Sequence, residues 1–106
     1  PTYTHDFALN VKALLEREYW GLYNMVCDGV TGRFEVALEL IDILGLKDKI
    51  KVTPVESSFF EKEYFAERPP SERLVDKKLD IRGLNTMRDW RICLKEYLDN
   101  YYKGYL

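Results

Sequence analysis

The sequence of 106 residues lacks the motifs on which most catalytic and metal sites are built. It has one histidine, His5, and two cysteines, Cys27 and Cys93, and their spacing matches no zinc site. The six glycines are scattered, so the chain has neither a dinucleotide-binding loop nor a phosphate-binding loop. Ser57 and Ser58 have only His5 as a candidate base, and turn capping explains them better. We therefore expect no catalytic residue and no metal ligand in this chain.

The sequence also has no long apolar run and no cluster of positive charge. No apolar stretch approaches the ~20 residues that span a membrane, and we expect no signal peptide. The 16 Lys and Arg residues are balanced by 18 Asp and Glu residues, without a dense basic run. Nucleic acids and anionic membranes bind clustered cations, so we expect neither as a partner. Two cysteines without metal-like spacing predict reduced, packed thiols and a cytoplasmic protein.

The composition indicates one folded domain over residues 1–106. Hydrophobic residues make up 46% of the chain and aromatic residues 14%, which is enough apolar surface to argue against a disordered protein. The first residue is Pro1 rather than Met, and a helical pattern begins almost at once. From this we expect a segment of a longer protein.

Apolar residues at intervals of three and four predict three amphipathic helices. They cover His5–Glu16, Arg33–Leu44 and Met87–Tyr102, and a short helical turn is predicted around Phe59–Lys62. The last helix has the clearest apolar stripe, formed by Trp90, Cys93, Leu94, Tyr97, Leu98 and Tyr101. We interpret its tryptophan as a core residue that anchors the helix.

The residues at the helix ends predict where each helix begins and stops. Thr4 is the expected N-cap of the first helix, and Thr86 with Asp89 resembles a capping box at the start of the last one. Arg88 and Asp89 are expected to act in the electrostatics of that same helix end. Gly45 is the expected stop of the middle helix.

Two short segments, Leu22–Cys27 and Ile50–Pro54, have the composition of β-strands. A helix separates them, and the order strand, helix, strand implies parallel strands joined by a right-handed crossover. Two strands alone do not make a stable parallel sheet. The sequence thus predicts an α/β fold with two short parallel strands, three main helices and an irregular connector, which is part of an architecture rather than a whole one.

The connector, Glu67–Trp90, is longer than an ordinary loop, which suggests a functional role. Its first part, "ERPPSERLVDKKL", and the helix sequence "MRDWRICLKEYL" together resemble the C-terminal end of the dTDP-4-dehydrorhamnose reductase family. The stretch "GLYNMVCDGVTGRFEVALEL" and the start of the chain, with Asp6 and Ala8, resemble two earlier segments of that family. The matching residues before the last helix are Arg68, Pro69, Leu74, Asp76, Lys78, Leu79 and Gly83.

The resemblance implies that the chain is the last third of an extended short-chain dehydrogenase/reductase. The family's nucleotide-binding and Tyr-x-x-x-Lys motifs lie upstream, so NADPH or NADH would bind the full-length parent and not this chain. The first strand would add to the sheet of the missing N-terminal cofactor-binding domain. We therefore expect the isolated chain to be inactive. We also expect an exposed apolar flank beside Leu22–Cys27, where a homodimer could form.

In this family the connector lines the cleft over the nucleotide-sugar substrate. The resemblance therefore implies that Arg68, Pro69 and Ser71 bind substrate. A guanidinium fork suits a pyrophosphate, and Pro69 restricts the backbone of Arg68. The alternative role for Arg68 is a surface ion pair with Glu67 or Glu72.

The activity that the resemblance implies is the reduction of a dTDP-4-keto-6-deoxy sugar with NADPH or NADH, in the biosynthesis of dTDP-L-rhamnose. A non-catalytic relative that binds a nucleotide sugar or regulates a partner is an alternative. A reductase or epimerase of the same superfamily that acts on another sugar is a second alternative.

Overall fold

The computed structural model describes residues 1–63, 69–102 and 104. The helical elements of this part are α1 (Thr4–Glu16), α2 (Arg33–Ile43), the 3₁₀ helix η1 (Ser57–Glu63), α3 (Lys77–Ile81) and α4 (Trp90–Tyr101). The three predicted helices and the predicted helical turn are confirmed. The sequence did not predict α3, because five residues are too few to show a periodic pattern.

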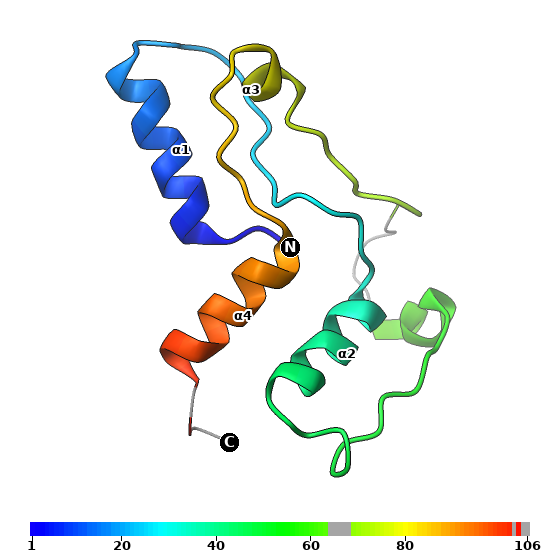
Figure 1. The fold of residues 1–106 in the computed structure, drawn as a ribbon. Helices are drawn as coiled ribbons and strands as arrows, with labels where there is room; N and C mark the ends of the chain where they lie inside the picture. Colours follow the sequence, from blue (N-terminus) through cyan, green and yellow to red (C-terminus); the bar gives the residue numbers. More distant parts are fainter. Residues whose placement is uncertain (64–68, 103, 105–106) are drawn as a thin grey trace.

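The helices surround extended chain segments (Figure 1). α1 lies at one side, and α4 begins beside the N-terminus of the chain. Between α1 and α2, residues 20–28 and 83–89 cross the middle of the molecule. Among the described helices, α2 and α4 are the pair whose backbones approach each other closely. The molecule is flat, with extents of 48 × 36 × 20 Å.

The two predicted β-strands are not formed among the described residues. Leu22–Cys27 and Ile50–Pro54 have no regular secondary structure. One isolated parallel bridge follows the first segment, in which the N–H of Asp28 donates to the carbonyl of Arg88 at 3.0 Å and the N–H of Trp90 donates to the carbonyl of Asp28 at 3.1 Å. A strand forms only where a neighbouring strand completes its hydrogen bonds, and among the described residues this single bridge is the only such pairing. The prediction of two parallel strands is therefore wrong for this structure.

The hydrophobic core is small and divided in two. One cluster joins the crossing segments to α4, and the other joins α1 to α3; they consist of Cys27, Met87, Trp90 and Cys93, and of Leu14, Leu79 and Leu84. The tryptophan is 1% exposed, which confirms it as a core residue. Both cysteines are buried free thiols, as predicted. Burial is the main cause that raises the pKa of the Cys93 thiol to about 12, which keeps this thiol protonated.

The N-caps of α1 and α4 differ from those predicted. Tyr3 is the N-cap of α1, and Thr4 is already helical. α4 is capped by Asp89, whose side chain accepts a 2.8 Å hydrogen bond from the backbone two residues later. Thr86 lies outside the helix, and its hydroxyl accepts a 2.6 Å hydrogen bond from the amide of Asn10. A long-range polar contact has therefore replaced the predicted local cap.

Arg88 joins α1 to α4, which corrects its predicted role in local helix-end electrostatics. Its guanidinium donates two hydrogen bonds to the carboxylate of Asp6, at 2.9 and 2.7 Å, and a third to Glu96 at 2.6 Å. The hydrogen bonds from Arg88 are the main cause that lowers the pKa of both carboxylates. Because these folded-state pKa values lie below the unfolded ones, the resulting stability is present at neutral pH and is lost as the pH falls through the folded-state values.

The ends of α1 and α2 share one backbone geometry. Gly45 follows α2 with φ +66°, as predicted for its stop. The corresponding residue after α1 is Glu18, with φ +53°. Its N–H donates to the carbonyl of Leu15 at 3.1 Å, and the N–H of Tyr19 donates to the carbonyl of Leu14 at 3.0 Å. These are the two bonds of a Schellman motif, which strains a residue with a β-carbon.

Glu18→Gly is expected to raise the free energy of unfolding by about 0.5–1 kcal/mol, because glycine adopts a positive φ without strain and this gain exceeds its larger entropy loss. Glu18→Ala is the matched control, since it removes the carboxylate but retains the β-carbon. Urea unfolding of both variants measures the difference. Equal stability of the Gly and Ala variants would contradict the assignment of strain to this position.

Candidate functional site

The sequence-predicted substrate residues lie at the start of the connector. Arg68 lies outside the described residues. Pro69 and Ser71 are both exposed. The hydroxyl of Ser71 accepts a 3.3 Å hydrogen bond from the backbone N–H of Arg73, which is a local turn contact. The structure therefore places these two residues on an accessible surface and shows no further hydrogen bond from either of them to the described residues.

The middle of the connector holds the segment that was predicted to be the first strand. Both carboxylate oxygens of Asp76 accept the N–H of Val26, at 3.0 and 3.2 Å. The ammonium of Lys78 donates to the carbonyl of Leu22 at 3.3 Å. Side chains thus take the place of a neighbouring strand along this edge of the segment. In the sequence, Asp76 and Lys78 match the pattern of the family, but no role was predicted for them.

The environment of Asp76 is unfavourable to its charge. The side chain is buried, and burial is the main cause that raises the pKa of its carboxyl, although the hydrogen bond from Val26 acts in the opposite direction. The negative charges of Asp80 and Asp28 add to the increase. A raised folded-state pKa means that the stability contributed by the neutral form is lost as the pH rises through that value. Asp76 and Asp6 thus make opposite contributions to the pH dependence of stability.

The other edge of the same segment has no partner. The backbone groups of Tyr23, Met25 and Cys27 make no hydrogen bond to the described residues, while their side chains pack in or against the core clusters. The side chain of Leu22 belongs to neither core cluster and is 87% exposed. In extended chain, alternate residues turn their backbone groups to opposite edges. The segment therefore has one edge held by Asp76 and its neighbours and one edge free to pair.

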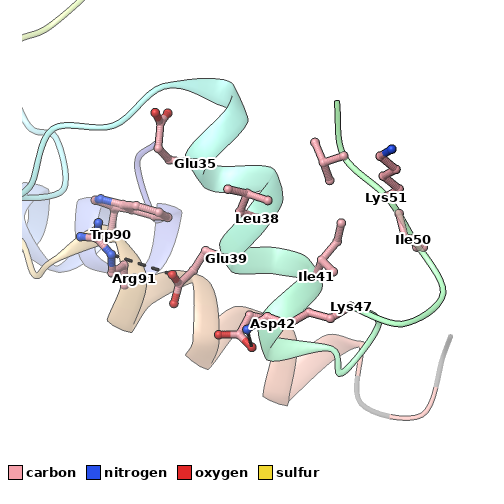
Figure 2. Close-up of a pocket in the computed structure, with 11 residues that line it drawn as sticks. Glu35, Leu38, Glu39, Ile41, Asp42, Lys47, Ile50, Lys51, Trp90 and Arg91 are labelled. Carbon is pink, nitrogen blue, oxygen red and sulfur yellow. Dashed lines mark ion pairs between the residues drawn. The ribbon is translucent and has the colours of Figure 1, made fainter. Parts of the chain in front are cut away.

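A hollow of about 770 Å³ lies between α2, the start of α4 and residues 47–52 (Figure 2). Figure 2 shows Leu38 and Ile41 on α2 facing Ile50 and Lys51 across it. The remaining residues that line it are Glu35, Glu39, Asp42, Lys47, Val52, Trp90 and Arg91. The floor is apolar and the rim is charged with both signs.

The carboxylates of this hollow are used in structural contacts. Glu35 accepts the N–H of Gly32 at 2.9 Å and so caps α2. Asp42 pairs with Lys47 at 2.5 Å. Glu39 lies 3.9 Å from Arg91. Each carboxylate has a cation or a backbone donor, so the arrangement resembles a stabilised surface more than a reaction centre.

Trp90 closes one end of this hollow and packs tightly against the turn that follows the free-edged segment. Gly29 has φ +87°, and a β-carbon there would lie 2.9 Å from Cδ1 of the indole. The indole N–H is buried and has no hydrogen-bond partner in the described part of the chain. Glycine is thus required at this position both by its backbone angle and by the approach of the ring.

The chain matches the model of the RmlD substrate binding domain over residues 1–103. This chain belongs to that family. The crystal structure of a dTDP-4-dehydrorhamnose reductase from Clostridium acetobutylicum is similar, with a TM-score of 0.87 and 29% sequence identity. The similarity covers 94% of this chain and 34% of that one, so the chain spans about a third of the length of this relative. No curated protein sequence matches significantly.

These matches confirm the resemblance that the sequence motifs indicated. They also support the α/β family, although no strand is formed among the described residues. Within the described residues there is no cluster of three or more side chains suited to a metal ion. None of the described helices has both the length and the apolar character needed to cross a membrane.

Asp76→Ala is expected to lower the free energy of unfolding at pH 7 by about 1–3 kcal/mol, because the N–H of Val26 loses its acceptor. Asp76→Asn retains an acceptor and removes the buried charge, so its cost is expected to be below about 1 kcal/mol. Urea unfolding at pH 7 compares the two variants. A larger loss for Asn than for Ala would contradict the roles assigned to the hydrogen bond and to burial.

Proposed function

We propose that this domain is the substrate-binding part of an enzyme like dTDP-4-dehydrorhamnose reductase. The parent enzyme would transfer a hydride from NADPH or NADH to a dTDP-4-keto-6-deoxy sugar, which yields dTDP-L-rhamnose. Family membership and the likeness to the Clostridium reductase support the assignment. The chain itself contributes to binding and orientation, and its catalytic partner groups belong to another part of the enzyme.

The observation that carries this proposal is the excess of exposed surface. The accessible surface is 8735 Å², whereas a globular protein of 12.6 kDa exposes about 6,200 Å². The radius of gyration is 16.7 Å, compared with about 13 Å for a compact domain of this length. The difference of about 2,500 Å² on one partner is characteristic of an obligate interface rather than a transient contact. The excess of exposed surface therefore supports the proposal that another part of the enzyme covers this domain.

The free backbone edge at Tyr23 and Met25 supports a specific way in which another domain would cover this surface. Unpaired backbone groups in extended chain accept a further strand. We propose that the sheet of a cofactor-binding domain pairs with this edge and converts Leu22–Cys27 into a strand. NADPH or NADH would then be held by that domain, since this chain has no nucleotide-binding loop. Without that domain, the same edge is free to pair with a second copy and form a homodimer.

For the substrate, we propose that Arg68 binds the pyrophosphate of the nucleotide sugar, and that Pro69 and Ser71, which follow it in the chain, contribute to the same binding surface. The exposure of Pro69 and Ser71 supports access to a ligand. The hydrogen bonds of Asp76 and Lys78 support a rigid middle part of the connector. A fixed middle part and a stiff proline pair reduce the conformational entropy that ordering the loop would otherwise remove on binding.

Titration with dTDP-rhamnose is expected to raise the melting temperature of the wild-type chain. Tenfold excess over Kd adds about 1.4 kcal/mol, which corresponds to about 6 °C for a domain of this size. Arg68→Ala is expected to lose most of this shift because the pyrophosphate loses its bidentate partner. Arg73→Ala is the matched control on the same connector and is expected to retain it.

Equal shifts for wild type and Arg68→Ala would contradict the binding role of Arg68. Oxidation of NADPH by the 106-residue chain, in the presence of a dTDP-4-keto sugar, would contradict the assignment of catalysis to another part of the enzyme.

A further inference from the structure

The helix α1 leaves a row of large apolar side chains in solvent. Phe7 is 43% exposed and Leu15 53%, and Val11 between them is half-buried. The three residues follow one another at intervals of four, so they form a single stripe along the helix, which we call the α1 stripe. The side chains that α1 buries are mostly polar: Asp6, Asn10 and Leu14. A surface helix normally turns its apolar stripe to the core, and α1 reverses this arrangement.

Hydrogen bonds on the buried side fix the rotation of α1 about its own axis. The carboxylate of Asp6 accepts two hydrogen bonds from Arg88, at 2.9 and 2.7 Å. The side-chain amide of Asn10 donates to the hydroxyl of Thr86 at 2.6 Å and accepts the N–H of Thr86 at 3.3 Å. Turning the α1 stripe inward would break these bonds and leave buried polar groups without partners. The stripe therefore stays on the outside of the described structure, and its residues belong to neither core cluster.

The two sides of α1 that flank its buried side differ in chemistry. One is the α1 stripe, and the other carries His5, Lys12 and Glu16. On that second side, the ammonium of Lys12 lies 3.7 Å from the carboxylate of Glu16, and both side chains are well exposed. The charged side is suited to water, whereas a row of apolar side chains at helical spacing is suited to a contact. α1 thus has one solvent side and two sides suited to burial, and the described residues cover one of these two.

The position of α1 relative to the segment Leu22–Cys27 indicates what would cover the stripe. Leu14 of α1 belongs to the core cluster against which the side chains of Tyr23 and Met25 pack. In extended chain, alternate side chains point to the same face. α1 therefore lies over one face of the segment, as a helix does in a layered α/β structure.

The buried side of α1 faces the edge of the segment that Asp76 holds. It contacts Thr86 and Arg88, and the chain at Arg88 forms the backbone bridge with Asp28 along that edge. A further strand can add only at the opposite, free edge. Neighbouring strands lie about 4.8 Å apart and a helix with its side chains is about 10–12 Å wide, so an added strand would fall within the width of α1.

We propose that the α1 stripe packs on the apolar face of the sheet whose edge strand pairs with Tyr23 and Met25. That strand presents aliphatic side chains toward α1, as the strands of a parallel sheet covered by helices do. The charged side of α1 remains in water. The inference rests on the proposed function and deepens it, because it adds a contact between a helix and the face of the sheet to the pairing of two edges.

The test is the rate of maleimide labelling of Leu15→Cys, measured on the 106-residue chain and on the full-length parent. Lys12→Cys on the charged side of α1 is the matched control, and the wild-type chain gives the background from its two buried thiols. In the 106-residue chain, the two introduced thiols are expected to react at similar rates. In the full-length parent, Leu15→Cys is expected to react at least about tenfold more slowly, while Lys12→Cys is unchanged. Phe7→Cys is the second variant on the stripe if Leu15→Cys does not fold.

Amide hydrogen exchange at Tyr23 and Met25 in the same full-length parent separates this inference from the proposed function. If these amides are protected and Leu15→Cys still reacts rapidly, the packing of the stripe is overturned and the pairing of the edge stands. If the amides exchange rapidly and the thiol reacts rapidly, both are overturned. Slow labelling of the 106-residue chain that becomes fast on dilution would show that a second copy covers the stripe, which also overturns the inference.

Discussion

The structure depends on how the segment Leu22–Asp28 is held. Two side chains of the connector and one backbone bridge fix it along one edge: Asp76 accepts from Val26, Lys78 donates to Leu22, and Asp28 pairs with the backbone around α4. A buried backbone donor without a partner costs about as much as a lost hydrogen bond, so these contacts are what allow the segment to stay extended. Both core clusters then form against its inward-facing side chains.

These hydrogen bonds explain why a chain with so little regular secondary structure has a defined shape. The connector has little helix of its own, yet its middle is hydrogen-bonded to a segment some fifty positions earlier in the sequence. The Arg88 contacts with Asp6 and Glu96 fix α1 relative to α4 by the same kind of long-range polar link. With two small apolar clusters in a flat molecule, such links take over part of the role that a single large core has in other domains. The flat shape in turn leaves a broad surface exposed.

The helices could be predicted from the sequence because their apolar periodicity is local. The start of α4 could not be predicted in this way. The hydroxyl of Thr86 accepts a hydrogen bond from Asn10, which is far away in the sequence, and therefore does not cap the helix. The strand prediction for Leu22–Cys27 rested on the apolar composition of the segment and failed on pairing, which depends on a neighbour. The roles of Asp76 and Arg88 depend on partners far away in sequence, and no local pattern reveals them. The site residues Pro69 and Ser71 stay predictions, since exposure alone does not show binding.

The most direct test of the account is amide hydrogen exchange along Leu22–Asp28, measured by NMR on the isolated chain. The account predicts that the amides of Val26 and Asp28, which are hydrogen-bonded, exchange at least about tenfold more slowly than those of Tyr23 and Met25. Uniform protection along the segment, or slower exchange at Tyr23 and Met25, would show that the second edge is already paired. The view of this domain as one part of a larger sheet would then be contradicted.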